Sequence, residues 1–159
     1  MNFTSIRRLL LSACFSLITS FYPVKAQSAM IEQALDYHEL KGLLLKHKRT
    51  AESVLGMKQF RATSNKERPE SIIYAFKKKT NDMQVLIRVR KSDGLVTEIA
   101  WDEKPSTIGN LTHDAVYDGF TPVAGNSRYY NRDQRMALFV NYKLAYGDDI
   151  VPCVLRAVK

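Results

Sequence analysis

Two segments of this chain alternate with a period of two residues, the pattern of a strand that buries one face. In the segment from Asp82 to Arg90, one face carries Met83, Val85, Ile87 and Val89. In the segment from Arg135 to Leu144, one face carries Met136, Leu138, Val140 and Tyr142. The turn glycines Gly94 and Gly147 follow, and all these matched positions lie 53 residues apart. We therefore expect two similar antiparallel meanders.

Neighbouring segments extend both meanders. In the first half, Ser71 to Lys78 and Leu95 to Trp101 are rich in β-branched and aromatic residues, and Ser92-Asp93-Gly94 predicts a hairpin turn. In the second half, the expected strands are Phe120 to Val123, a short one at Tyr129-Tyr130, and Ile150 to Val158, with a turn at Tyr146-Gly147-Asp148. The polar, proline-containing segment from Ser64 to Glu70 predicts a loop.

Helices are expected before each meander. Residues 29–47 are rich in helix formers, and a second helix is predicted from Thr50, as N-cap, to Gly56. In the second half, a helical segment is predicted from Pro105-Ser106 to Asp118, before Gly119. Gly56 followed by Phe60 resembles Gly119 followed by Phe120, at an offset of about 60.

The predicted fold class is α+β, with two tandem repeats of short helices followed by a three- to four-stranded antiparallel meander. The repeats would span residues 29–103 and 104–159. The alternative is that two meanders look alike without duplication, since alternation and turn glycines are common in any antiparallel sheet. This order resembles the beta-lactamase-inhibitor-protein-like fold of small bacterial envelope proteins. The resemblance implies that the sheets form a concave face that binds another protein.

The N-terminus predicts export. Arg7 and Arg8 precede a charge-free apolar run of about 14 residues, Leu9 to Tyr22, which is too short to span a bilayer as a helix. Small residues at Val24 and Ala26 predict cleavage near Ala26, so that residues 1–26 form a signal peptide and 27–159 a single compact domain. We expect a periplasmic or secreted bacterial protein. Leu11-Ser12-Ala13-Cys14 also matches a lipobox, so membrane attachment is expected only if Cys14 is lipidated.

Net charge and cysteine content further restrict the classes of protein to which this chain could belong. The chain has 24 basic and 16 acidic residues, a net charge of +8. Without Arg7, Arg8 and Lys25 the mature chain would have 21 basic residues against 16 acidic ones, or +5. That surplus is small for a nucleic-acid binder, and export also argues against one. Cys153 would be the only cysteine of the mature chain, and its apolar surroundings predict a buried thiol.

The sequence contains no recognisable catalytic or cofactor motif. His38, His47 and His113 are not at metal-ligand spacing, and no phosphate-binding glycine loop or nucleophile elbow is present. The acidic pairs Asp102-Glu103 and Asp148-Asp149 lie at predicted strand ends, where solvated carboxylates are ordinary. We therefore expect no enzyme activity, no metal and no cofactor.

Basic and aromatic residues are the candidates for binding a partner. The candidates are Lys77, Arg88, Arg90, Trp101, Arg128, Tyr129, Tyr130 and Arg132. Tyr, Trp and Arg are enriched at interface hot spots, and a positive patch steers an acidic partner. The same residues could equally belong to the core or to a solvated surface.

The leading hypothesis is a non-catalytic exported module that binds another protein, possibly acidic, through a sheet face. An inhibitor of an exported enzyme and an immunity protein against a toxin are its specific versions. A small-molecule or lipid carrier of the cell envelope is the first alternative. An enzyme whose groups converge only in the fold is the second.

Overall fold

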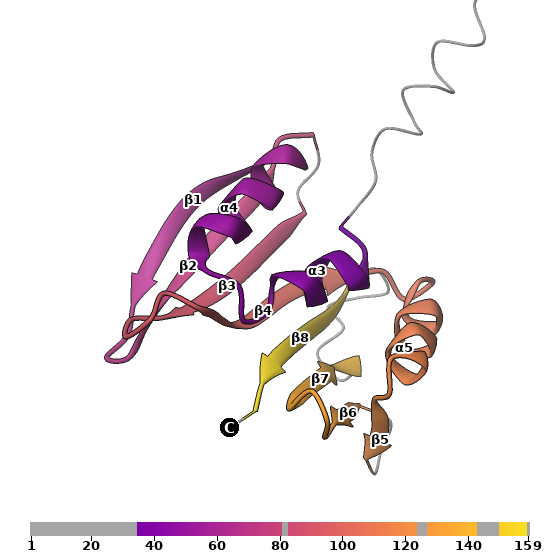
Figure 1. Ribbon diagram of the computed structural model, residues 1–159. Helices are drawn as coiled ribbons and strands as arrows, with labels where there is room; N and C mark the ends of the chain where they lie inside the picture. The colour runs from indigo at the N-terminus through magenta and orange to yellow at the C-terminus, as the bar shows by residue number, and fades with distance from the viewer. Residues whose placement is uncertain (1–34, 81–82, 124–126, 143–149, 159) are drawn as a thin grey trace, which may run out of the picture. The chain divides into compact units, whose positions relative to one another are not determined.

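The computed structural model describes residues 35–80, 83–123, 127–142 and 150–158. In these residues the chain is α+β, with three helices and one antiparallel sheet of eight strands (Figure 1). This confirms the predicted α+β class. The predicted signal peptide, residues 1–26, and the predicted turn at Tyr146-Gly147-Asp148 lie outside the described residues.

The first described helix, α3 (Tyr37–Leu43), ends earlier than predicted. Asp36 caps its start: the Asp36 side chain accepts from the Glu39 N–H at 2.7 Å, and the Glu39 carboxylate accepts from the Asp36 N–H at 3.2 Å. The prediction that the helix continues to residue 47 is wrong, because the chain after α3 pairs with a strand. There the Leu45 N–H donates to the Val96 carbonyl, and the Lys46 carbonyl accepts from the Val96 N–H.

The other two helices are similar in length. α4 (Lys48–Met57) begins after His47, whose Nδ1 accepts from the Arg49 N–H at 3.3 Å. The predicted start at Thr50 is wrong, because the imidazole of His47 supplies the cap three residues earlier. α5 (Ile108–Tyr117) lies within the predicted segment and stops before Gly119, whose φ of 86° favours glycine.

Two four-stranded meanders make the sheet. The strands are β1 (Phe60–Glu67), β2 (Ser71–Lys78), β3 (Gln84–Arg90), β4 (Val96–Glu103), β5 (Thr121–Val123), β6 (Arg128–Asn131), β7 (Met136–Val140) and β8 (Val151–Ala157). Their order across the sheet is β1-β2-β3-β4-β8-β7-β6-β5. The two meanders therefore join where β4 pairs with β8, the last strand of each half.

One expected loop is a strand. Residues 64–67 of the predicted loop belong to β1, which pairs along its length with β2. Only Phe60 of β1 is buried, so the strand carries polar residues on both faces and lacks the alternation that identifies the others. Its bulge between Ala62 and Ser64 and its charged side chains are devices that protect a sheet edge.

The predicted hairpin and the alternation along β3 are confirmed. The predicted alternation of the second half is confirmed only as far as Val140, because β7 ends there and Tyr142, expected on the buried face, is 46% exposed. Val85, Ile87 and Val89 are buried on β3, and Leu138 and Val140 are buried on β7. The turn between β3 and β4 has Gly94 at a φ of 70°. The side chain of Asp93 accepts from the Leu95 N–H at 3.1 Å, as expected of an aspartate–glycine turn.

All three helices and one face of the sheet share a single hydrophobic core. It includes Leu40 of α3, Leu55 of α4 and Leu111 of α5 together with alternate residues of the central strands. In Figure 1, α3 and α4 lie in front of β1 to β4. Trp101 and Tyr129, both predicted as partner-binding residues, are buried in this core, only 3% and 6% exposed. They pack the sheet against the helices, so we leave them out of the binding surface below.

Cys153 is buried at the centre of β8, as its apolar neighbours predict. Burial, and to a smaller extent the charges of Glu103 and Asp102, raise the pKa of its thiol to about 12. The nucleophilic form is the thiolate, so this thiol is unreactive in the folded protein at neutral pH.

We expect Cys153 to make the folded state less stable in alkali. The thiol of the unfolded chain deprotonates from about pH 9, whereas the thiol of the folded protein stays protonated up to about pH 12. The contribution of the protonated Cys153 to folding stability is therefore complete below pH 9 and is lost between pH 9 and about 12. Measured by urea unfolding, the free energy of unfolding of wild type should fall by about 1 kcal/mol more between pH 8 and pH 10 than that of Cys153→Ala. An equal pH dependence in the two proteins would contradict the burial of this thiol.

Candidate partner-binding face

The face of the sheet opposite the helices carries two rows of side chains that do not belong to the core. We call it the open face. The register places one row across β3, β4, β8, β7 and β6 as Leu86, Ala100, Val154, Phe139 and Arg128. The adjacent row consists of Arg88, Glu98, Arg156, Ala137 and Tyr130. The second row is mostly charged or aromatic, and the first mostly apolar.

Three charged residues join β3, β4 and β8 on the open face. Glu98 accepts from Arg156 Nε at 2.6 Å, and its other carboxylate oxygen lies 3.1 Å from Arg88 Nη2. Glu98 is mostly covered, with 14% of its side chain exposed, whereas Arg88 and Arg156 are 41% and 50% exposed. One carboxylate therefore holds two guanidinium groups in place while both remain accessible.

An aromatic ring continues this cluster toward β6. The guanidinium carbon of Arg156 lies 5.6 Å from the centre of the Phe139 ring, and that of Arg128 lies 6.0 Å from it. Such distances allow cation–π attraction, which restrains both arginines. We call this group of five residues, which combines members of both rows, the arginine row. It consists of Arg88, Glu98, Arg156, Phe139 and Arg128, and it crosses five strands from β3 to β6.

The structure brings only some predicted candidates into this surface. Arg88 and Arg128 belong to the arginine row, and Tyr130 lies beside it on β6. Lys77 is on the same face, but it pairs with Gln84 of β3. Gln84 lies four residues from Arg88 along that strand, which is roughly 13 Å, so Lys77 is remote from the arginine row. Arg90 bonds Asp93 in the hairpin at 3.0 Å. Arg132, after β6, lines a second pocket with Tyr130 and Pro122.

Sequence reasoning missed Glu98, Phe139 and Arg156. Two of them carried a usable signal, because Glu98 is the charged residue within the apolar strand Leu95 to Trp101 and Arg156 is the charged residue within Ile150 to Val158. A charge inside a half-buried strand points to the solvent face. Phe139 carried no such signal, since an aromatic residue suits either face.

A second group of titratable residues lies on the helix side. Lys41 Nζ is 2.8 Å from Asp118 Oδ2, and His38 Nδ1 is 3.5 Å from the same oxygen. Burial and the charge of Asp118 raise the pKa of Tyr37. These contacts join α3 to the end of α5, and we interpret them as structural. No group of three potential metal ligands occurs among the described residues.

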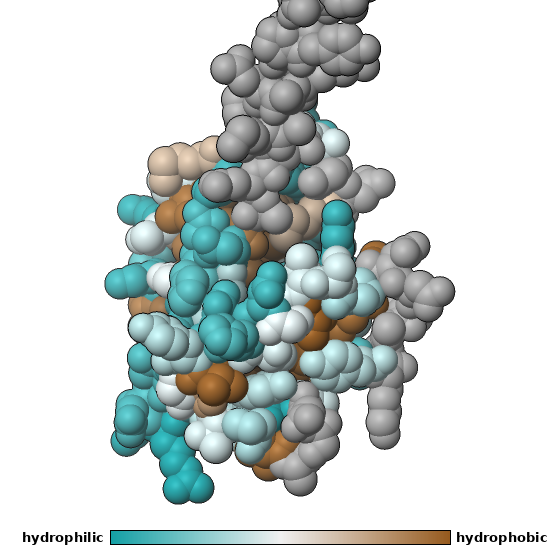
Figure 2. Space-filling view, turned by 90° about the vertical axis from the view of Figure 1, so that its right-hand side faces the viewer, coloured by the Kyte–Doolittle hydropathy of each residue, from teal (hydrophilic) through white to brown (hydrophobic). Residues whose placement is uncertain are grey.

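Figure 2 shows the side of the domain that carries α5 and β5. Outside the atoms drawn in grey, hydrophilic residues there surround small, separate hydrophobic patches and no continuous apolar surface is seen. Isolated apolar residues are normal on a protein surface and do not indicate a docking site. No helix among the described residues is long and apolar enough to span a membrane.

Comparisons with known proteins give no family for this chain. No family model, curated protein or solved structure matches it significantly.

Proposed function

We propose that this protein is an exported, non-catalytic module that binds an acidic surface of another protein through the open face. The observation that carries the proposal is the contrast between the two faces of the sheet. One face packs on three helices, and the other presents the arginine row beside partly exposed apolar residues. Arginine and aromatic residues at the centre of a surface are the usual anchors of an interface.

The charge of the open face favours an acidic partner. The arginine row contains three guanidinium groups, of Arg88, Arg128 and Arg156, and one carboxylate, of Glu98. It therefore has two positive charges in excess. Because Glu98 and Phe139 already restrain the arginines, a partner would lose less side-chain entropy on binding them. Leu86, 36% exposed, adds apolar area beside the charges.

We also propose that the two halves are tandem repeats. The helices α4 and α5 both have ten residues, and they lie 60 positions apart. Each is followed by one residue of positive φ, Gln59 at 66° and Gly119 at 86°. A buried phenylalanine then opens the first strand, Phe60 or Phe120. The residue that matches Gly119 in this comparison is Gln59, and not Gly56 as the sequence pattern suggests.

Strand register supports the same proposal. At an offset of 53, Lys78 of β2 matches Asn131 of β6, and both are buried polar residues. Phe76 and Tyr129 match in the same way, and both are buried aromatic residues. The halves join through the antiparallel pairing of their last strands, where Ala100 lies opposite Val154. These regularities favour the resemblance to the beta-lactamase-inhibitor-protein-like fold, and an inhibitor or immunity role.

The repeat proposal predicts opposite effects at its two matched turn residues. Gln59→Gly should stabilise the protein by about 0.5–1 kcal/mol, because glycine relieves the strain of a positive φ. Gly119→Gln should destabilise it by about 1 kcal/mol or more, because a Cβ there would also lie 3.3 Å from Asn131 Nδ2. Urea unfolding measures both, and a loss of stability in Gln59→Gly would contradict equivalent turns.

Affinity capture from a cell-envelope extract tests the binding proposal. We expect the mature protein to retain an acidic protein in stoichiometric amount at low salt and to release it as ionic strength rises. A monodisperse protein with no partner but a measurable turnover would overturn the proposal in favour of an enzyme.

A further inference from the structure

A pocket of about 410 Å³ lies where the two halves of the sheet separate. The ladder between β4 and β8 ends at the pair of Glu98 with Arg156. Beyond that pair, Val96 of β4 bonds the backbone of Leu45 and Lys46, and the Val158 N–H donates to the Arg135 carbonyl at 2.7 Å. Each strand has therefore taken another backbone partner, and the space between them is left unfilled.

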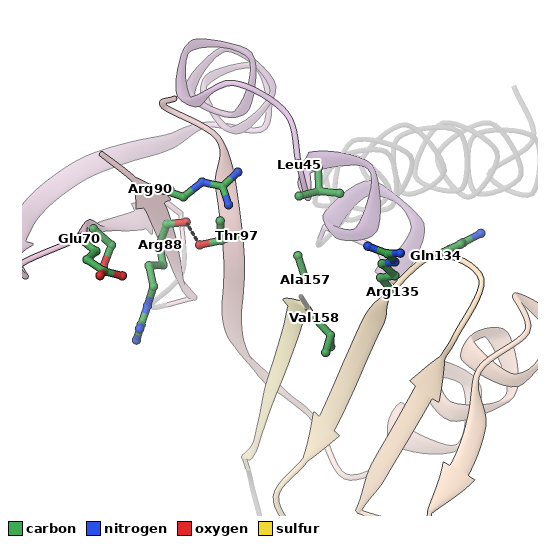
Figure 3. A pocket seen from close by; sticks show the side chains of 10 residues that line it. Leu45, Glu70, Arg88, Arg90, Thr97, Gln134, Arg135, Ala157 and Val158 are labelled. Carbon is green, nitrogen blue, oxygen red and sulfur yellow. Dashed lines mark hydrogen bonds between the residues drawn. The ribbon is translucent and has the colours of Figure 1, made fainter. Parts of the chain in front are cut away.

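The walls of this pocket combine apolar and basic side chains. Figure 3 shows Thr97 on one side, Ala157 and Val158 at the end of β8, and Leu45 above them. Arg90 stands on the β3 side and Arg135 at the start of β7, across the pocket from it. The volume is within the usual range for small-molecule sites, about 300–1,000 Å³.

The arginines that line the pocket have unused hydrogen-bonding capacity. Asp93 accepts from Nε and Nη2 of Arg90, which leaves the Nη1 hydrogens for another acceptor. Arg135 forms no ion pair with a described carboxylate, and it holds a positive φ of 49°, a conformation unfavourable for arginine. The buried Nε of Arg88, another lining residue, has no hydrogen-bond partner among the described groups.

The charge balance around the pocket is positive. Arg88, Arg90, Arg135 and the neighbouring Arg156 face the carboxylates of Glu70, Asp93 and Glu98. Glu98 is shared between two arginines, so one guanidinium charge remains without a counter-charge in this group. Guanidinium groups bind carboxylates through paired, charge-assisted hydrogen bonds.

We propose that this pocket binds a carboxylate group on a small, partly apolar body. Arg90 and Arg135 hold the carboxylate, and Leu45 and Val158 contact the apolar part. The carboxylate belongs either to a free small molecule or to an acidic side chain of a bound protein. The pocket shares Arg88 with the arginine row, but Arg90 and Arg135 lie outside that row, so occupation of the pocket does not require that the open face binds a partner.

Titration of the mature protein with succinate, butyrate and an acetylated tri-aspartate peptide tests the proposal, with ionic strength held constant by sodium chloride. Methyl chemical shifts of Leu45 and Val158 report binding at the pocket. We expect saturable shifts with a Kd in the millimolar range, weakened about tenfold or more in Arg90→Gln and in Arg135→Gln. Arg128→Gln is the matched control, because Arg128 does not line the pocket, and its Kd should equal that of wild type.

The three probes distinguish the two sources of the carboxylate. Tighter binding of succinate or butyrate indicates a free small molecule, and tighter binding of the peptide indicates an acidic protein segment. The proposal is overturned if no probe shifts the Leu45 and Val158 methyl signals, or if Arg128→Gln weakens binding as much as the pocket variants do. Thermal unfolding of each variant shows that the fold is retained, and Arg135→Gly, which suits the positive φ, provides a second pocket variant.

Discussion

Replacing Trp101 by alanine is expected to remove about 3–5 kcal/mol from the free energy of unfolding. Trp101 is 3% exposed, and it lies between Val85 of β3 and Cys153 of β8, where the two meanders join. Its indole N–H also donates to a Glu103 carboxylate oxygen at 3.2 Å. Domains of this size have a total stability of about 5–15 kcal/mol, so the variant should be largely unfolded or very sensitive to urea.

The matched control is Tyr117→Ala, which removes an aromatic side chain that is 87% exposed at the end of α5. Its free energy of unfolding should stay within about 0.5 kcal/mol of wild type. Urea unfolding followed by circular dichroism measures both. Similar small losses in the two variants would mean that Trp101 does not fill the core at this junction.

Replacing Arg156 by glutamate is expected to weaken partner binding about 30-fold or more, which corresponds to about 2 kcal/mol. Arg156 lies at the centre of the arginine row, where it donates to Glu98 and its guanidinium carbon is 5.6 Å from the centre of the Phe139 ring. A glutamate there would repel both Glu98 and the acidic partner, and it would release the ring of Phe139. Titration calorimetry with the captured partner measures the change.

The charge-matched control is Arg49→Glu, since Arg49 lies in α4 on the helix side of the sheet. We expect it to leave the Kd within about threefold of wild type, with only a long-range electrostatic effect that salt removes. Because the introduced carboxylate of Arg156→Glu would repel Glu98 within the protein itself, Arg156→Gln serves as a milder variant with an intermediate loss. Equal losses in Arg49→Glu and Arg156→Glu would indicate a general charge effect and contradict a specific surface.

Much of the fold follows from the sequence because burial of one sheet face imposes a period of two. That rule predicts β3 and β7, and the aspartate–glycine turn predicts the hairpin after β3. The same rule fails for β1, because an edge strand with polar residues on both faces has no periodic signal. It fails also at the end of α3, where a tertiary pairing with Val96 decides where the helix stops.

The candidate surface is less predictable, because residue type does not reveal which face a side chain occupies. Tyr129 and Tyr130 are neighbours on one strand, so they point to opposite faces, and only the register with β7 shows that Tyr129 is the buried one. Trp101 shares its face with Ile99, and this alternation is the signal that identifies it as a core residue. The arginine row joins residues of β3, β4, β6, β7 and β8, and only the strand order β4-β8-β7 brings them together.

Site-specific photo-crosslinking tests the open face most directly. A benzophenone amino acid is placed singly at Leu86 or Val154 on the open face, and at Met57 or Tyr117 at the exposed ends of α4 and α5. We predict that one protein partner is crosslinked from Leu86 and Val154 in the cell envelope, and not from Met57 or Tyr117. Crosslinks from Met57 and Tyr117 alone, or no crosslink from Leu86 and Val154, would contradict binding through the open face.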